Sequence, residues 1–463
     1  MKNEPTMLER AAYQTLLDWK HSTPKKALLV DGARQIGKTF LIEEFAKNEY
    51  PDHITIDFIK DSQAAELLGS AKNPRQVIER LSLLVGKEVV PGTLVFFDEV
   101  QCAPDIVTFS KYLAEDGRFD VIMSGSMLGV ELGGVKSFPV GYLRIEHLYP
   151  LSFEEFCWSQ GVPNSVLADV EESCRDRRPI EQAIHERLID LFRLYIVIGG
   201  MPEAVQRYLD TGFDLGATRQ VQSDLVTLYR EDISKHAKDR SLQVKAIFDA
   251  LPSQLAKENK RFELKSLQDQ ARFERYAKDF AWLVGAHAAL KTVSVREPKY
   301  MLARTEEEAR FKLYQSDVGM LTSRYPISVA SSVLTGAKDV NFGAVYENVV
   351  AQELAAAQCP LRYYRNSRKG EVDFLVETQE TKVLPIEVKS GKNYQVHTAL
   401  NNLLDEPDFG IEEAVVLAET NVSVQERGDK KISYLPLYMI GSIAKEAAGQ
   451  VQEEQHFAPP AWD

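Results

Sequence analysis

Short apolar runs alternate with amphipathic stretches through the first third of the chain. Five runs of strand length lie within residues 1 to about 160, and between them apolar residues recur at the spacing of a helix face. The runs are Ala27–Asp31, His53–Phe58, Thr93–Phe97, Asp120–Ser124 and Tyr142–His147. Strands that alternate with helices form parallel sheets with helices on both faces. The pattern therefore predicts an α/β domain of this kind.

The pattern changes twice further along the chain. Residues from about 165 to 335 are mostly helical in pattern, with long stretches at Ile180–Tyr195 and Arg272–Val284. From about residue 338 to 440 a helix precedes several strands. These elements are Phe342–Ala357, Arg362–Arg365, Glu371–Glu377 and Lys382–Val388.

These changes in the hydrophobic pattern predict an α/β chain of four domains. We expect a parallel-sheet domain at 1–160, a helical subdomain at 161–240, a winged-helix-like domain at 241–337 and a further α/β domain at 338–463. The last segment, 449–463, is polar and contains proline, which predicts a loosely ordered tail.

A winged-helix pattern covers residues from about 243 to 320. Its elements are helices at Val244–Ala256, near Leu264–Gln270 and at Phe273–Val284, and strands near Leu290–Val295 and Phe311–Tyr314. A basic link (Lys257, Lys260 and Arg261) follows the first helix. Such a unit can place one helix in a DNA major groove. The candidate helix mixes Arg272, Arg275 and Lys278 with Glu274 and Asp279, which is also the pattern of a solvated face. DNA contact and a packing module both remain open.

Composition narrows the class of protein. The 463 residues are 44% hydrophobic and 27% charged, as in ordinary globular proteins. No apolar run reaches the roughly 18 to 20 residues that cross a bilayer, and the N-terminus lacks the apolar centre of a signal peptide. We therefore expect a cytoplasmic protein with no membrane partner. Four scattered cysteines without a CxxC pair disfavour a disulfide framework or a zinc site.

The net charge of -13 argues against a protein that binds nucleic acid over its whole surface. A local basic groove stays compatible with it, because electrostatic attraction acts over roughly 8 to 10 Å at physiological salt.

The segment Gly32–Thr39 reads GARQIGKT and matches the spacing GxxxxGK[ST] of a phosphate-binding loop. The glycines let the loop turn its N–H groups toward phosphates, and the following helix adds its positive end. Lys38 is expected to bridge the β- and γ-phosphates, and Thr39 to hold Mg²⁺. The predicted nucleotide contacts are Gly32, Ala33, Arg34, Gln35, Ile36, Gly37, Lys38, Thr39 and Phe40. The alternative is a coincidental glycine loop, which the preceding strand and following helix disfavour.

An acidic pair, Asp98 and Glu99, follows the apolar run Thr93–Phe97. A buried parallel strand reads as such a run, and ligands bind at its carboxyl end. Asp98 is expected to hold Mg²⁺ and Glu99 to polarise the attacking water. A solvated turn is the alternative for the pair alone.

The next strand ends in Ser124-Gly-Ser126. Ser124 or Ser126 is a candidate for sensing the γ-phosphate, although a plain loop explains the same residues. No NKxD-like sequence is present, so ATP is favoured over GTP.

The last third of the chain contains three short segments with acidic or basic residues that could form one site. Glu347 lies on the predicted helix Phe342–Ala357, Asp373 lies in EVDFLV, and Glu387 and Lys389 share one face of a strand in PIEVKS. A link at Thr378–Thr381 would let the two strands pair as a hairpin and bring Asp373 to Glu387 and Lys389.

Two carboxylates that hold Mg²⁺ and a lysine that positions water are what a metal-dependent phosphodiesterase needs. Glu347 is the expected extra ligand. Upstream, Arg362, Arg365, Arg368 and Lys369, with Tyr363 and Tyr364 between them, are candidates for tracking a nucleic-acid backbone by charge and stacking. Ordinary charge alternation on an exposed strand is the competing interpretation.

Taken with several longer phrases, these residues resemble a known family. The phrases are GARQIGKT, FFDEVQ, SGSMLGV, FPVGYLRIEHLYPLSFEEF, GGMPEAV, YREDI, EVDFLV and PIEVKSG. Nearly the whole chain is similar to prokaryotic AAA-type ATPases whose C-terminal half carries a domain of unknown function with restriction-endonuclease-like D…ExK motifs. The resemblance implies rings of subunits or a state that is held closed until triggered. Many relatives have Gly-Arg at Gly141-Tyr142, so Arg144 is the nearest substitute for a subunit-bridging arginine.

The leading hypothesis is an ATPase that binds ATP and Mg²⁺ and couples them to a nuclease-like domain acting on DNA, with a homo-oligomeric ring as a possible assembly. The rival is an ATP-dependent switch or scaffold that binds DNA or a protein without cleavage. A small-molecule P-loop enzyme would leave the last third of the chain without a role.

Overall fold

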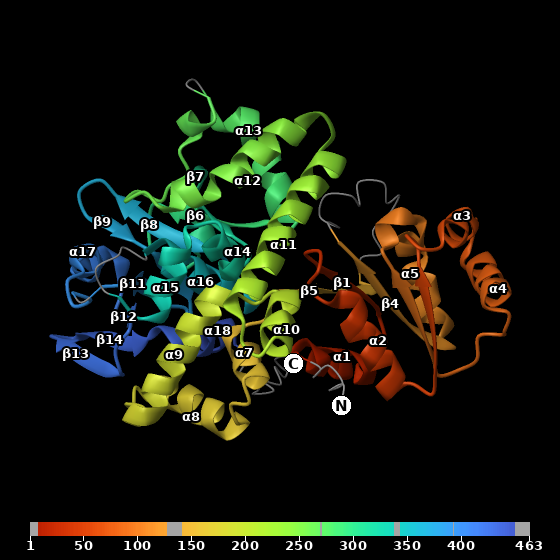
Figure 1. Cartoon of the computed structure of the whole chain (residues 1–463), viewed down its shortest axis with the longest axis horizontal. Helices are drawn as coiled ribbons and strands as arrows, with labels where there is room; N and C mark the ends of the chain where they lie inside the picture. Colours follow the sequence, from red (N-terminus) through yellow and green to blue (C-terminus); the bar gives the residue numbers. More distant parts are fainter. Residues whose placement is uncertain (1–7, 127–140, 269–270, 338–342, 392, 450–463) are drawn as a thin grey trace, which may run out of the picture.

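The structure is a computed structural model that describes residues 8–126, 141–268, 271–337, 343–391 and 393–449. The predicted tail 449–463 and the predicted helix start at Phe342 therefore lie almost wholly outside the described residues, as do Gln270 and much of SGSMLGV and FPVGYL. Figure 1 shows a smaller N-terminal lobe beside a larger lobe that contains the rest of the chain. Among the described helices, none is long and apolar enough to cross a membrane.

A five-stranded parallel sheet forms the smaller lobe, as the sequence predicted. Its order is β2-β3-β4-β1-β5, and every neighbouring pair is parallel. The strands are β1 (Ala27–Gly32), β2 (Asp52–Asp57), β3 (Thr93–Asp98), β4 (Phe119–Gly125) and β5 (Leu143–Leu148). Both β1 and β3 are buried along their whole length, which explains their unbroken apolar runs.

Helices cover both faces of this sheet. Leu28 and Val30 of β1 pack with the N-terminal helix and α2 (Lys38–Glu49), whereas Ala27 and Leu29 pack on the opposite face. Successive strand residues alternate between faces, so one strand contributes to two cores. The helices are α1 (Ala12–His21), α2 (Lys38–Glu49), α3 (Ser62–Gly69), α4 (Pro74–Val85) and α5 (Asp105–Asp116), with a 3₁₀ turn η1 (Val100–Cys102).

The next part of the chain is helical. Its helices are α7 (Phe153–Ser159), α8 (Asn164–Arg175), α9 (Gln182–Ile198), α10 (Pro202–Asp210), α11 (Leu215–His236), α12 (Ser241–Leu255), α13 (Phe273–Gly285), α14 (Val318–Ser323) and α15 (Ile327–Leu334). Short 3₁₀ turns are η3 (Lys238–Arg240), η4 (Leu264–Ser266) and η5 (Leu302–Thr305). The short helix predicted near Leu264–Gln270 is thus only the single turn η4 within its described residues.

A second sheet crosses the predicted domain boundary at residues 337 and 338. Its order is β7-β6-β8-β9. The strands are β6 (Ala289–Val295), β7 (Glu306–Gln315), β8 (Arg362–Asn366) and β9 (Gly370–Val372). Strands β6 and β7, which were predicted to belong to a winged-helix-like domain, form a hairpin, but β6 also pairs in parallel with β8 of the C-terminal region. The exposed edge of a strand has unpaired N–H and C=O groups that can pair with any strand beside it. Two strands that are distant in sequence can therefore be neighbours in a sheet.

The third sheet has the order β10-β11-β12-β14-β13. Its strands are β10 (Phe374–Glu377), β11 (Val383–Val388), β12 (Glu413–Ala418), β13 (Ser423–Arg427) and β14 (Lys430–Pro436). The surrounding elements are α16 (Gly343–Ala356), α17 (Thr398–Leu404), η6 (Pro407–Phe409), η7 (Leu437–Met439) and α18 (Ile440–Ala448). The single strand predicted at Glu371–Glu377 is two strands, β9 and β10, which belong to different sheets and meet at Asp373.

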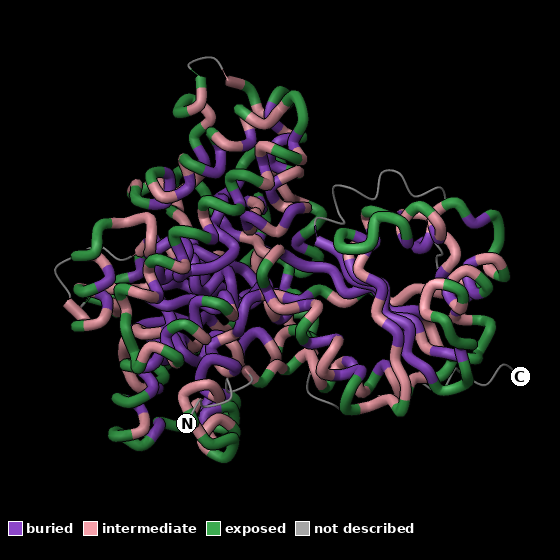
Figure 2. Tube along the Cα trace, turned by 45° about the vertical axis from the view of Figure 1, so that its right-hand side comes forward, coloured by how far each residue is buried: buried purple, intermediate pink, exposed green. Residues whose placement is uncertain are grey.

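One apolar core extends through most of the larger lobe. It runs from Leu151 before α7, through α9 and α14 to α16, and on to Ala444 in α18. Figure 2 shows this buried trace in the larger lobe and the buried strands of the smaller lobe. The helical region and the C-terminal region therefore share their interior.

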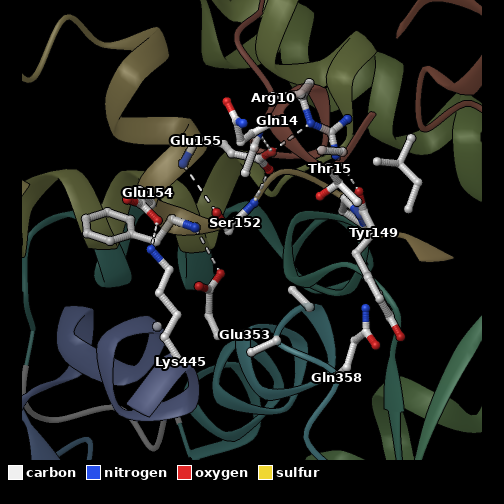
Figure 3. Close-up of a pocket in the computed structure, with 18 of the residues that line it drawn as sticks. Arg10, Gln14, Thr15, Tyr149, Ser152, Glu154, Glu155, Glu353, Gln358 and Lys445 are labelled. Carbon is white, nitrogen blue, oxygen red and sulfur yellow. Dashed lines mark hydrogen bonds and ion pairs between the residues drawn. The ribbon is translucent and has the colours of Figure 1, made fainter. Parts of the chain in front are cut away.

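A polar network around Glu353, on α16, lies where the N-terminal segment contacts the larger lobe. Glu353 Oε1 accepts hydrogen bonds from the Phe153 backbone N–H at 2.9 Å and from the Tyr195 hydroxyl at 2.8 Å. Arg10, which precedes α1, donates to Glu155 Oε1 at 3.0 Å. Figure 3 shows Arg10, Glu155 and Glu353 on a cavity of about 520 Å³, with Lys445 directed at Glu154. Burial raises the pKa of Glu353 to about 7, against 4.5 for an ordinary glutamate, despite the hydrogen bonds it accepts.

This pKa makes stability depend on pH. The folded chain binds more protons than the unfolded chain between pH 4.5 and about 7, so the free energy of unfolding falls as the pH rises through that window. Glu353→Gln removes the titration and keeps an acceptor. We expect wild type to lose about 2 kcal/mol more than Glu353→Gln between roughly pH 5 and 8, measured by urea unfolding. The control Glu171→Gln removes an exposed carboxyl on the same cavity and should follow wild type; parallel pH curves for wild type and Glu353→Gln would contradict the assignment.

Candidate functional site

The phosphate-binding loop lies between β1 and α2, at the carboxyl edge of the first sheet. Gly32 is required there because a Cβ would lie 2.3 Å from the carbonyl oxygen of Leu148 on β5. Gly37 precedes α2 with a left-handed φ of 83°, which glycine adopts without a Cβ clash. Ala33 and Ile36 are buried, and Gln35 is exposed.

Lys38 is buried inside this loop. Its Nζ donates to the carbonyl oxygens of Gly32 at 2.9 Å and Ala33 at 2.8 Å. Burial lowers the pKa of Lys38 to about 8, and the charges of Glu99, Asp31 and Asp98 oppose that shift. The ammonium group therefore lies among backbone oxygens at the start of α2.

Thr39, Asp98 and Ser124 meet beside the loop. Thr39 Oγ1 donates to Asp98 Oδ2 at 2.7 Å, and the Ser124 hydroxyl donates to Asp98 Oδ1. Burial raises the pKa of Asp98, although both hydroxyls oppose the rise. The neighbouring order β3-β4-β1 brings these three residues together. The structure thus places the candidate magnesium ligands and the candidate sensor Ser124 in one cluster.

Glu99 follows Asp98 in a left-handed conformation, with φ of 57°. Its Oε2 accepts hydrogen bonds from Gln101 Nε2 and, at 3.3 Å, from Ser126 Oγ. A non-glycine residue in such a conformation costs on the order of 1–3 kcal/mol and persists where its surroundings fix it. Ser126, the other candidate sensor, therefore contacts the predicted water-polarising residue, and Gln101 is a partner that sequence reasoning missed.

Helix α11 also contacts the loop. The guanidinium of Arg34 pairs with Asp232, and its Nε donates to Ser126 Oγ at 3.3 Å. The Tyr229 hydroxyl donates to the Arg34 carbonyl oxygen at 3.3 Å. Tyr229 and Asp232 belong to the phrase YREDI, for which the sequence predicts no role. Figure 1 shows α11 running between the two lobes.

Two further predicted residues lie at the surface. The Phe40 residue is 56% exposed on α2. Arg144, on β5, pairs with Glu146 of the same strand at 2.6 Å. A role for Arg144 in a neighbouring subunit stays a prediction.

The second candidate site lies where the β9–β10 corner meets β11 and α16. The predicted hairpin is present: β10 and β11 are antiparallel with Phe374 opposite Ile386, so Asp373 lies across from Glu387. Asp373 Oδ2 accepts the Val388 backbone N–H at 3.0 Å, and Lys389 Nζ pairs with Glu387 Oε1 at 2.7 Å. Glu347 reaches the same place from α16. These residues line a cavity of about 590 Å³.

A buried lysine that sequence reasoning missed lies in this cluster. Lys312, on β7, is 0% exposed. Its Nζ lies 2.8 Å from Glu371 Oε1, 3.2 Å from Glu347 Oε2 and 3.3 Å from Asp373 Oδ1. The available signal was a lysine within the apolar run FKLY, two residues before Tyr314. The Tyr314 hydroxyl donates to Glu347 Oε2 at 2.9 Å, so both side chains leave one face of the strand.

Glu347 has a second ammonium partner. Lys260, from the predicted basic link, lies 2.5 Å from Glu347 Oε1. Burial would raise the pKa of Glu347, but Lys312 and Lys260 outweigh it and lower that pKa.

The pKa values of the other two carboxyls, Asp373 and Glu387, are raised and not lowered. Burial and the charge of Glu347 raise the pKa of Asp373 despite Lys312. Burial and Asp373 raise the pKa of Glu387 to about 8, although Lys389 opposes them. Glu387 Oε2 is buried and has no hydrogen-bond partner among the described residues. This oxygen is therefore an acceptor of the cluster that could bind a cation or a proton.

The stacking surface predicted upstream of this site is wrong. Tyr363 and Tyr364 are 0% and 2% exposed, because they alternate between the two faces of a β8 that is covered on both sides. Three of the four predicted cations are paired with carboxylates: Arg362 with Glu306 and Glu377, Arg365 with Glu371, and Lys369 with Glu406. Arg368 is exposed.

The candidate DNA-reading helix α13 is partly buried. Arg272, Arg275 and Lys278 are exposed, whereas Asp279 is buried and pairs with Arg240. One of its acidic residues, Asp279, is thus a buried partner of Arg240 and not a solvated charge. Contact of α13 with DNA stays a prediction.

Family models match three stretches of the chain. Residues 24–157 match the model described as AAA domain. Residues 189–330 and 342–440 match two models described as domains of unknown function, DUF8612 and DUF4143. Residues 24–157 therefore form an AAA-type P-loop ATPase domain, as the sequence predicted. The third description assigns no activity, so the nuclease-like interpretation of residues 338–463 stays a prediction. No curated protein matches this chain.

Three solved structures are distantly similar. A Walker-type ATPase of Pyrococcus abyssi is 14% identical, with a TM-score of 0.42 over 68% of this chain and 95% of that chain. The ORC1 protein of Aeropyrum pernix in complex with DNA is 10% identical, with a TM-score of 0.29 over 72% and 94%. AMPPCP-bound DnaA of Aquifex aeolicus is 13% identical, with a TM-score of 0.30 over 54% and 73%. At such low values, the function of this chain has to be argued from its own residues.

The Lys312 cluster generates a stability prediction. Lys312→Met keeps most of the side-chain volume but leaves Glu347 and Asp373 without their shared ammonium partner. Removing one partner of a buried ion pair costs about 3–5 kcal/mol. We expect a loss of that order in the free energy of unfolding at neutral pH, measured with urea, and a smaller loss at acidic pH as the carboxyls take up protons.

Lys291→Met is the matched control, because Lys291 lies on the adjacent strand β6 and pairs with the exposed Glu308. It should cost less than about 1 kcal/mol. Equal losses in the two variants would show that the Lys312 ion pairs do not stabilise the fold.

Proposed function

We propose that this chain binds and hydrolyses ATP at the AAA-type domain and couples that cycle to a nuclease-like domain that acts on DNA. The observation that carries the first part is the contact of Thr39 with Asp98, beside Lys38 and Glu99. Lys38 and the N–H groups of the loop would bind the phosphates, and Glu99 would orient the attacking water. Mg²⁺ held by Thr39 and Asp98 would neutralise charge on the phosphates.

The second part rests on the carboxylates around the cavity of about 590 Å³. Asp373 and Glu387 would hold a divalent cation with Glu347, and Lys389 would position the water that attacks a phosphodiester. The buried, unpartnered Glu387 Oε2 supports this assignment, since it is an oxygen ligand directed into a polar site. Such a cation would activate water and neutralise the scissile phosphate.

Lys312 competes for the same carboxylates. A cation that binds Asp373 and Glu347 has to displace its ammonium group, because Lys312 lies within 3.3 Å of both. We propose that this competition holds the site closed until the larger lobe rearranges. Contacts support a route from the nucleotide: the P-loop pairs with α11, α11 packs on α12, and α12 packs on β7, which carries Lys312. Assembly into a ring, with Arg144 at the interface, is part of the same proposal.

The same ion pairs favour a second candidate function. A carboxylate cluster that the chain neutralises with its own Lys312 and Lys260 is also suited to a structural role. The protein would then be an ATP-dependent switch or scaffold that binds DNA or a protein partner without cleavage.

The ATPase proposal predicts distinct defects at two residues. Lys38→Ala should abolish nucleotide binding, because it removes the ammonium group that contacts the phosphates. Glu99→Gln should bind ATP and hydrolyse it about 10²–10⁴-fold more slowly, because the amide cannot accept a proton from water. Binding of a fluorescent ATP analogue and phosphate release measure the two effects. Normal turnover by Glu99→Gln would assign the water-orienting role to another residue.

Cleavage is tested with the purified full chain, Mg²⁺ or Mn²⁺, and linear and circular DNA, with and without ATP. We expect ATP-dependent cutting that Lys389→Ala reduces at least about 100-fold. The control Lys382→Ala changes an exposed lysine just before β11 and should leave cutting intact. No cutting by wild type, together with ATP-dependent DNA binding that survives Asp373→Ala and Glu387→Ala, would establish the scaffold instead.

A further inference from the structure

A cluster of two histidines and an aspartate lies just before the P-loop. Asp31 is the residue before Gly32 on β1, and His147 is its direct partner on β5. His287 comes from the turn between α13 and β6. Its Nε2 lies 2.8 Å from Asp31 Oδ2, and His147 Nδ1 lies 3.3 Å from the same oxygen. The cluster therefore joins the nucleotide-binding sheet to the larger lobe.

We propose that Asp31, His147 and His287 bind a divalent transition-metal ion such as Zn²⁺. Their ligand atoms all lie within 4.8 Å of one another. Zinc bonds to nitrogen and oxygen are about 2.0–2.2 Å long, which places the ligand atoms of a tetrahedral site roughly 3.4 Å apart. Small rotations of the two rings would bring the three side chains to that spacing.

The types of ligand select the metal. Two imidazoles and one carboxylate suit Zn²⁺ and its neighbours in the first transition row, whereas Mg²⁺ and Ca²⁺ prefer sets of oxygen ligands. The predicted Mg²⁺ ligands Thr39 and Asp98, and the C-terminal carboxylates, supply no imidazole. The cluster is thus chemically distinct from both candidate sites.

A second observation points to an ion. Asp31 is only 5% exposed, and its Oδ1 is buried without a hydrogen-bond partner among the described residues. The His147 side chain is 41% exposed, which leaves one side of the cluster open for a water molecule as fourth ligand. Three protein ligands and one open position are typical of a zinc site that is accessible to solvent.

The surrounding backbone is already fixed. The turn that carries His287 is held by hydrogen bonds from the His287 N–H to Val284 at 3.0 Å and from the Ala288 N–H to Leu283 at 2.9 Å. Asp31 and His147 are registered by the β1–β5 pairing. A bound ion would cross-link the start of the P-loop to this turn, and the inference holds whether or not the chain cleaves DNA.

The test uses the full chain, stripped of metal by a chelator and titrated with Co²⁺, whose visible absorption reports nitrogen–oxygen sites of low symmetry. We expect one equivalent to bind with a visible band that Zn²⁺ abolishes. His147→Ala and Asp31→Asn should weaken binding at least about tenfold. His21→Ala, which removes an exposed histidine on α1, should bind like wild type.

Two further variants test whether the cobalt band comes from this cluster and whether its loss reflects unfolding. Asp373→Asn should retain the band, which separates this site from the C-terminal carboxylates. His147→Gln keeps a polar contact with Asp31 and removes the imidazole, so loss of the band there cannot be ascribed to loss of the fold if far-UV circular dichroism is unchanged. An absent band in wild type, or an equal band in His147→Gln, would overturn the proposal.

Discussion

The larger lobe is organised around one buried positive charge. An ammonium group without water needs carboxylate partners, because the cost of desolvating a charge exceeds what any apolar contact returns. Lys312 satisfies this requirement only if β7, the β9–β10 corner and α16 converge, since its partners Glu371, Asp373 and Glu347 come from those elements. The shared sheet of β6 and β8 and the continuous apolar core from α7 to α18 accommodate the same convergence. Strands β6 and β7 and the C-terminal region consequently belong to one packed unit.

The P-loop also contains a buried ammonium group that the surrounding chain has to stabilise. Lys38 is also buried, but backbone oxygens of its own loop hold the ammonium group, and no carboxylate of the described residues forms an ion pair with it. The loop in turn is held from outside by Arg10, which donates to the Ile36 carbonyl oxygen at 3.1 Å, and by the pair of Arg34 with Asp232. The proposed ligands act on these charges in opposite ways. Phosphate brings negative charge to Lys38, whereas a divalent cation competes with Lys312. Helix α11 lies between Lys38 and Lys312 in the fold, because it pairs with the P-loop and packs on α12 of the larger lobe.

Local chemistry explains which parts of both sites were predictable. The loop GARQIGKT, the acidic pair after Thr93–Phe97 and the hairpin that joins Asp373 to Glu387 each depend on residues that are near in sequence or on a repeating strand–helix order. The errors share a different cause. Tyr363 and Tyr364 look like an accessible basic and aromatic surface until another sheet covers β8, and the strand Glu371–Glu377 looks continuous until its halves join different sheets.

By itself, the sequence determined the α/β class, the parallel sheet and the glycine loop between β1 and α2, because periodicity and glycine geometry act over a few residues. Only the tertiary structure decided which charges meet. Lys312 reaches Asp373 across 61 residues, and His287 reaches Asp31 across 256. No pattern along the chain encodes such pairings, since they depend on which sheet edges and helix faces come together. The interpretation of the C-terminal carboxylates changed most. From the sequence they form an open metal site, whereas in the structure Lys312 pairs with two of them.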